Sequence, residues 1–176
     1  MKKAIGLILA VVFFTACGDL KVSSYLNQPP GKETGRYRAI EIYDFETELP
    51  DVPEELLKRL PDEIANTLKS RKTRFQRISR EPIEDIPAAN TVVLLGEIVD
   101  YESGRDIKFE EGAVKFGESS ITVQIALVDK ESGEEVASGQ VNGFSSLGFF
   151  RSGIVAKELY KNLAEEIVKL ITQNYK

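Results

Sequence analysis

The side chains that most often perform catalysis are scarce in this chain of 176 residues. It contains no histidine and a single cysteine, Cys17, which excludes Ser-His and Cys-His pairs and removes the commonest general base. Acidic pairs such as Glu54-Glu55 and Glu134-Glu135 remain. Because adjacent residues of a strand or a helix point in different directions, we interpret these pairs as solvated surface charge. The residue types therefore predict a protein that is not an enzyme.

Two turns have part of the pattern of a ligand-binding loop. The turn from Asp129 to Gly133 has acids two residues apart, but it is too short for a calcium loop and lacks the later bidentate Glu. Gly143, Gly148 and Gly153 precede a predicted helix, but no Gly-Lys-Ser/Thr follows them, so a phosphate loop is not indicated. The ligands of a zinc site are also missing. We predict a plain hairpin turn in the first case, and no metal or cofactor.

Cys17 closes an apolar segment at the N-terminus. Lys2 and Lys3 precede an apolar run over residues 4–14, and small residues follow it, which is typical of an export signal. The run is well short of the roughly 20 residues that cross a bilayer. Two readings remain open. Either residues 1–16 are a lipoprotein signal peptide that ends before a lipid-modified Cys17, or an ordinary signal is cleaved nearby and the cysteine is incidental.

The tetrapeptide Phe14-Thr15-Ala16-Cys17 resembles the lipobox of bacterial lipoproteins, with Phe14 where Leu is usual. The resemblance implies that Cys17 becomes the first mature residue and carries thioether-linked diacylglycerol. Stable anchoring takes two or more acyl chains, so the membrane is the first expected partner. Gly18, where Asp would mark retention, resembles lipoproteins sorted to the outer membrane. We expect a lipid-anchored protein of the bacterial envelope that faces the periplasm, in the outer membrane rather than the inner.

The remainder of the chain has the composition of one folded domain. It is 42% hydrophobic with a formal net charge of −5, and an acidic domain lacks the clustered Lys and Arg that bind nucleic acid. With its single cysteine lipidated it has no disulfide, so packing alone must hold the fold. Residues 17–36 show no apolar period and include a Pro-Pro-Gly sequence, which predicts a flexible tether after the lipidated cysteine. Residues 37–176 are the predicted single α+β periplasmic domain.

The apolar periods predict the element order β-α-β-β-β-β-α. Strands are expected over about residues 37–46, 75–78, 91–101, 121–127 and 134–144, and helices from residue 53 and over about 155–171. Pro61 predicts a kink or restart in the first helix, and Gly96 predicts a bulge. The fold class is α+β, with two helices on one face of a largely antiparallel sheet of four to five strands.

The segment between the last strand and the last helix contains a candidate contact site. It places Phe144, Leu147, Phe149 and Phe150 among glycine and serine residues. Exposed apolar patches mark contacts with partners or membranes, but the same rings are also suited to closing the core beside the last helix. Both readings remain open.

The stretch over residues 103–119 is a second candidate. Its apolar residues Ile107, Phe109, Val114 and Phe116 alternate with polar ones. This pattern fits an edge hairpin that exchanges a strand with a partner, and it fits an ordinary hairpin of the same sheet equally well.

Several turn and strand patterns resemble the DUF4410 domain, a family of bacterial lipoproteins of unknown function. They lie at residues 101–105, 117–121 and 128–136, and the likeness covers about residues 37–172. The chain departs from the family at Phe149-Phe150, where glycines usually dominate. The resemblance implies no known activity. By fold analogy alone, the element order also looks like that of envelope-assembly lipoproteins such as the curli-pore subunit and activators of peptidoglycan polymerases.

These observations favour a non-catalytic, lipid-anchored lipoprotein that serves as a binding or scaffold component of an envelope assembly or transport complex. Its partners would be the membrane, through lipid on Cys17, and another envelope protein, and the role is compatible with an oligomer. The alternative is a periplasmic carrier of an apolar ligand, which would need an enclosed cavity between helices and sheet.

Overall fold

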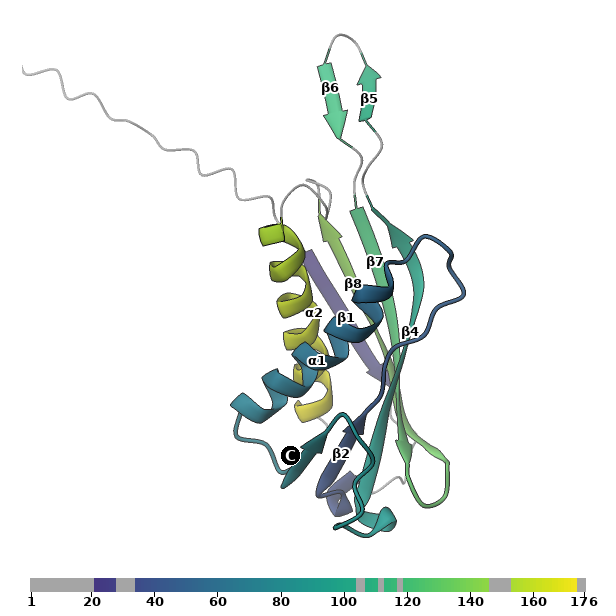
Figure 1. The fold of residues 1–176 in the computed structure, drawn as a ribbon, viewed down its shortest axis with the longest axis vertical. Coiled ribbons are helices and arrows are strands. Elements are labelled where there is room, and N and C mark those ends of the chain that lie inside the picture. Colours follow the sequence, from purple (N-terminus) through teal and green to yellow (C-terminus); the bar gives the residue numbers. More distant parts are fainter. Residues whose placement is uncertain are drawn as a thin grey trace, which may run out of the picture.

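Six strands form one mixed sheet, and both helices lie on the same side of it (Figure 1). The computed structural model describes residues 21–27, 34–103, 107–110, 113–116, 119–145 and 153–173. The elements are β1 (Lys21–Asn27), η1 (Thr34–Arg36), β2 (Ala39–Ile42), α1 (Glu54–Ser70), β3 (Arg77–Ser79), η2 (Ala88–Asn90), β4 (Thr91–Glu102), β5 (Ile107–Glu110), β6 (Ala113–Phe116), β7 (Ser119–Asp129), β8 (Glu135–Ser145) and α2 (Gly153–Gln173). Neither α1 nor α2 combines the length and the apolarity that a membrane-spanning helix needs.

The strand order is β1-β8-β7-β4-β2-β3. Strands β1, β8, β7 and β4 pair with one another in antiparallel fashion, whereas β2 is parallel to both β4 and β3. The predicted α+β class with two helices is confirmed. The predicted count of four to five strands was too low, and the sheet is mixed where a largely antiparallel one was expected.

The sixth strand comes from the stretch that the sequence analysis assigned to the tether. Residues 21–27 form β1, which pairs along its whole length with β8. On the helix side Val22 packs against the core and the Ser24 hydroxyl donates to Oε1 of Glu166 on α2, at 2.5 Å. A serine with a half-buried partner therefore takes a position where an apolar residue would have revealed the strand. The tether reading was wrong for this segment.

Helix α1 runs through Pro61 without a restart. Proline has no N–H, so the carbonyl of Leu57 lacks its usual partner one turn later. That carbonyl instead accepts a hydrogen bond from the backbone N–H of Phe45, at 3.0 Å. The predicted restart was wrong, because a different segment of the chain supplies the missing donor. The same bond fixes the segment after β2 against the helix.

Gly96 makes room for an aromatic ring and does not form the predicted bulge. The register of β4 against β7 shifts between Ile98 and Asp100, beyond the glycine. A Cβ at position 96 would collide with the ring of Phe45, which is buried. The glycine thus lets Phe45 lie directly on the β4 backbone.

Replacing Gly96 by Ala is expected to lower the free energy of unfolding by about 1–3 kcal/mol, because the new methyl group overpacks the Phe45 ring. Urea unfolding followed by circular dichroism measures the change. Gly35→Ala is the matched control, since the nearest atom to a Cβ there is Nη2 of Arg74 at 3.8 Å. A Gly96→Ala protein as stable as the control would contradict the contact.

Helix α2 confirms the predicted C-terminal helix. Its buried side chains include Leu159, Leu163 and Ile167, which share one helical face. A Cβ at Gly143 on β8 would lie 3.1 Å from Leu163, so the missing side chain lets the helix approach the sheet. The core fills the layer between the sheet and the two helices.

Strands β5 and β6 form a separate two-stranded sheet. Ile107 pairs with Phe116 and Phe109 with Val114, and Figure 1 shows the hairpin beyond the ends of β4 and β7. The reading of an ordinary hairpin within the main sheet was therefore wrong. Strand exchange with a partner remains a prediction.

Candidate binding site on the open face of the sheet

The face of the sheet opposite the helices carries two rows of side chains that cross four strands. In the first, Tyr25 on β1 is in register with Gln140, Gln124 and Glu97 on β8, β7 and β4. In the second, Asn27, Ser138, Ala126 and Leu95 are in register across the same strands. Alternate residues of a strand point to opposite faces, so both rows lie on the face that the helices leave open.

These rows line a trough of about 650 Å³, here called the open-face trough. Ala126, Ser138 and Gly139 lie beneath it and are small, which leaves the space unfilled. Tyr25 borders it from β1, and Tyr43 borders it from the segment that follows β2. The volume is in the range of sites that bind small ligands or a short peptide segment.

The trough contains the large apolar side chains that are most exposed in the described part of the chain. Tyr25 is 58% and Leu95 41% exposed, and both line the trough. Each exposed apolar square ångström is worth about 25 cal/mol if it is later removed from water. The pair therefore makes this face a candidate contact surface.

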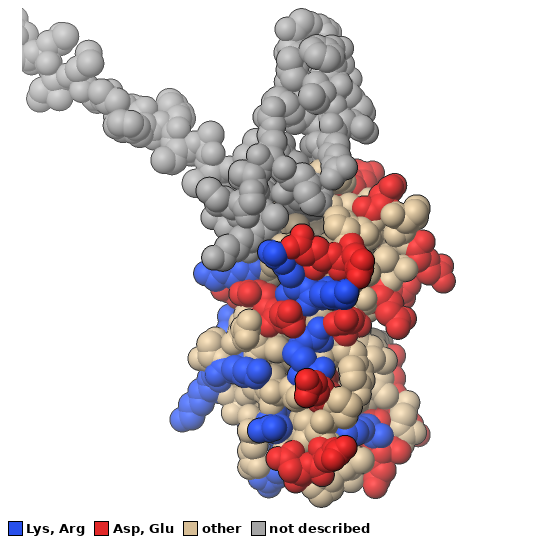
Figure 2. Space-filling view, in the orientation of Figure 1, with Lys and Arg blue, Asp and Glu red and all other residues tan. Residues whose placement is uncertain are grey.

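The trough is also acidic. Asp44, Glu46, Glu97 and Glu135 line it, and among the described residues no Lys or Arg does. Figure 2, which views the helix-bearing side, shows Lys and Arg over the helices, interspersed with acids. Asp44 is ion-paired with Arg80. The other three carboxylates form no ion pair with any residue that the structure describes.

A buried carboxylate positions one wall of the trough. The hydroxyl of Tyr43 donates to Oε2 of Glu41 at 2.9 Å, and Oε1 of Glu41 accepts from Nζ of Lys130 at 2.5 Å and from the N–H of Ile83 at 2.7 Å. Burial raises the pKa of Glu41, but the hydrogen bonds from Lys130, Ile83 and Tyr43 outweigh it and lower the pKa below its ordinary value. Glu41 is therefore ionised, and both of its oxygens accept hydrogen bonds from neighbouring groups.

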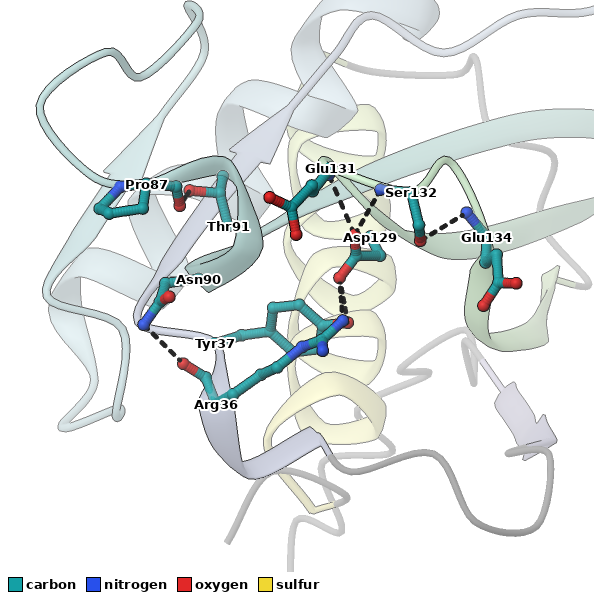
Figure 3. A network of polar contacts seen from close by, with 9 residues as sticks. All are labelled: Arg36, Tyr37, Pro87, Asn90, Thr91, Asp129, Glu131, Ser132 and Glu134. Atoms are coloured by element: carbon teal, nitrogen blue, oxygen red, sulfur yellow. Dashed lines mark hydrogen bonds and ion pairs between the residues drawn. The ribbon is translucent and has the colours of Figure 1, made fainter.

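A second buried carboxylate closes the β7–β8 turn (Figure 3). Oδ1 of Asp129 accepts the N–H groups of Glu131 and Ser132 at 3.0 and 2.8 Å, and Oδ2 accepts the Tyr37 hydroxyl at 2.7 Å and the Arg36 guanidinium. The predicted hairpin turn is confirmed, with its oxygens directed at N–H and O–H donors. Within the described residues no group of three acidic, His or Cys side chains is arranged to hold a metal ion.

The acidic pairs seen in the sequence lie where surface charge was expected. Glu54 and Glu55 are exposed and pair with Lys58 and Arg59 one turn later on α1. The carboxylates that are buried, Glu41 and Asp129, were not recognised from the sequence. Their cationic partners lie far along the chain, and no local pattern indicates them.

The predicted contact residues are described only in part. Phe144 lies in β8, where Lys21 and Ser120 are its cross-strand partners, and it is half-buried. Its register places it on the open face, away from α2, so for this ring the reading that it closes the core beside the last helix was wrong. Cys17, Leu147, Phe149 and Phe150 lie outside the described residues.

Comparison with known proteins identifies the fold. No family model and no curated protein matches the chain. Two crystal structures of the PelC dodecamer from Paraburkholderia phytofirmans superpose with TM-scores of 0.54 and 0.52 at 17% and 19% identity, each covering 88% of this chain and 98% of PelC. The chain shares the fold of PelC.

A protein from Xanthomonas campestris assigned to the DUF330 family also superposes, with a TM-score of 0.52 and 10% identity over 84% of this chain and 90% of that one. Identities this low establish the architecture and leave the function to be argued from the site. The DUF4410 assignment stays a prediction.

Proposed function

We propose that this chain is a non-catalytic, lipid-anchored periplasmic lipoprotein that binds another envelope protein through the open-face trough. The observation that carries the proposal is the exposure of Tyr25 and Leu95 in one trough. The structural use of both buried carboxylates supports a binding role over catalysis. The acidic lining disfavours the alternative of a carrier for an apolar ligand, because desolvating carboxylates against an apolar molecule is unfavourable.

The proposed lipid anchor at Cys17 is close in sequence to the first strand, β1. Three residues separate Cys17 from Lys21, so a lipid on Cys17 is within about 14 Å of the strand. Lys21 pairs with Phe144. We therefore propose that the Phe144 end of the sheet faces the outer membrane. Leu147, Phe149 and Phe150 remain predicted membrane or partner contacts.

The proposal includes self-association of the chain. PelC, which shares the fold, was crystallised as a dodecamer. Lipid on Cys17 would hold copies at one surface and raise their effective concentration for each other and for a partner. We propose that the lipidated protein works as an oligomer in this setting.

Replacing Cys17 by Ser should release the protein from membranes, because the acyl chains supply the attachment. Fractionation of cells that express each form measures the distribution. Ser24→Ala, which keeps the cysteine, should stay membrane-bound. A Cys17→Ser protein that remains in the membrane fraction would remove the anchor from the proposal.

Replacing both Phe149 and Phe150 by Ser should leave the melting temperature nearly unchanged if these rings contact a membrane or a partner. Differential scanning calorimetry of the purified proteins measures both melting temperatures. A drop of more than about 10 °C would place the rings in the core, where each loss costs about 3–5 kcal/mol.

A further inference from the structure

We propose that the open-face trough binds an extended segment of a partner protein in which Lys or Arg residues alternate with apolar ones. The inference rests on the proposed function, whose binding face is this trough, and it adds the chemistry of the partner. Three observations support the inference: the charge of the trough, the distance between its exposed apolar side chains, and its depth.

The charge selects a cationic partner. Glu46 and Glu97 are partners in a parallel bridge, with the N–H of Glu46 donating to the carbonyl of Gly96 and the N–H of Ile98 donating to that of Glu46, each at 2.9 Å. Like charges held side by side on a sheet are unfavourable. Both side chains are exposed, and Glu135 adds a third negative charge to the same lining. A cation between these groups would relieve the repulsion.

The neighbouring cations within the described structure are already engaged. Arg80 donates to Asp44 and to Asp62, and its guanidinium also bonds the carbonyl of Ile42. Lys130 is held by Glu41 and by the carbonyl of Ile83. The positive charge that the trough favours must therefore be brought by the ligand.

The spacing selects an extended segment over a small amine. Leu95 on β4 and Tyr25 on β1 are separated by β7 and β8, which is about 14 Å at about 4.8 Å per strand, and by two residues along the strands, so their backbones are about 16 Å apart. Four residues of extended peptide cover about 13 Å at about 3.3 Å each, and large side chains at both ends make up the remainder. A segment with apolar side chains at both ends of this span would cover Leu95 and Tyr25 together. The Lys or Arg side chains between them leave the segment on its other side, but their long, flexible stems let the charged ends bend back toward Glu46 and Glu97.

The depth lets a backbone approach the sheet. Ala126 and Ser138 lie in register between Leu95 and Asn27, so small side chains occupy the middle of the span. The Gln124 side chain in the adjacent row offers an amide donor and acceptor for peptide groups. An anionic ligand would meet the same carboxylates unfavourably.

The test uses the full lipidated protein in detergent micelles and three fluorescein-labelled peptides. They are Phe-Lys-Phe-Lys-Phe, which has apolar residues at both ends of the span, and its counterparts with Gln or Glu in place of Lys. Fluorescence anisotropy should show binding of the Lys peptide alone, weakening as salt is added. Glu46→Gln combined with Glu97→Gln should weaken that binding about tenfold, as two surface charge contacts allow. Glu81→Gln combined with Glu84→Gln removes equal charge from exposed positions outside the trough and should leave binding within about twofold.

Absence of binding by the Lys peptide, equal binding by the Gln or Glu peptide, or an unchanged affinity in the trough variant would overturn the inference. Those results leave the proposed function standing if a trough residue still crosslinks to an envelope protein in cells. Failure of the proposed function appears separately, as membrane retention of Cys17→Ser or as loss of crosslinking.

Discussion

Replacing Asp129 by Asn should lower the free energy of unfolding by about 3 kcal/mol. The Asp129 side chain is 1% exposed, and its two oxygens accept four hydrogen bonds. An amide nitrogen in place of one oxygen would turn a donor toward donors, and the buried groups left unpaired carry the penalty. A fall of about 10 °C in melting temperature is expected.

Tyr37→Phe is the matched control, because it removes one donor and leaves the carboxylate in place. It should cost about 1 kcal/mol. Thermal unfolding of the three proteins at neutral pH compares them directly. If Asp129→Asn were no less stable than Tyr37→Phe, the network of Figure 3 would not be a main support of the turn.

The same residue predicts a pH dependence. Burial raises the pKa of Asp129, but hydrogen bonds from Ser132, Tyr37 and Arg36 outweigh it and hold the pKa well below its usual range. A carboxyl with a lowered pKa stabilises the fold fully above its unfolded value of about 3.9 and loses that contribution as the pH falls. Wild type should therefore lose more stability than Asp129→Asn between about pH 7 and pH 3.

Replacing Glu41 by Gln should also lower the free energy of unfolding by about 3 kcal/mol, since it removes one charge of a buried pair. Glu41 is 0% exposed and Lys130 keeps 26% of its side chain in solvent. The variant also loses an acceptor for the Tyr43 hydroxyl, so a wall of the open-face trough should loosen.

Chemical denaturation measures the change, and a second substitution interprets it. Adding Lys130→Met to Glu41→Gln removes the unpaired cation and should recover part of the lost stability. If Glu41→Gln costs less than about 1 kcal/mol, the carboxylate does not organise this region.

The parts of the fold that local pattern determines were predictable. Helix α2 follows from the four-residue spacing of Leu159, Leu163 and Ile167. The β7–β8 hairpin follows from the strict alternation of β7 and from the turn that ends at Gly133, whose φ is +71°. In both, adjacent residues in the sequence carry the whole signal.

The parts that failed depend on partners far along the chain. Strand β1 was missed because Ser24 is paired with Glu166 on the last helix. The absence of a restart in α1 was missed because the hydrogen bond to the Leu57 carbonyl comes from the N–H of Phe45. No local pattern reports such bonds.

The trough was missed for the same reason. Tyr25, Leu95 and Tyr43 come from three separate segments that meet only in the sheet. The contact residues that the sequence did suggest are three aromatic residues and a leucine that lie close together in the sequence, between positions 144 and 150. The residues of a binding face that crosses four strands are far apart in the sequence, so no short stretch contains them together.

We propose that the open-face trough, and not the helix side, is the binding face of the protein. A photo-crosslinking amino acid placed at Tyr25, and separately at the exposed Asn66 of α1, tests it in intact cells that carry the full chain. We expect a covalent adduct with an envelope protein from position 25 and none from position 66. The adduct from position 25 should be lost when Leu95 is replaced by Arg. Equal adducts from both positions, or none from position 25, would contradict it.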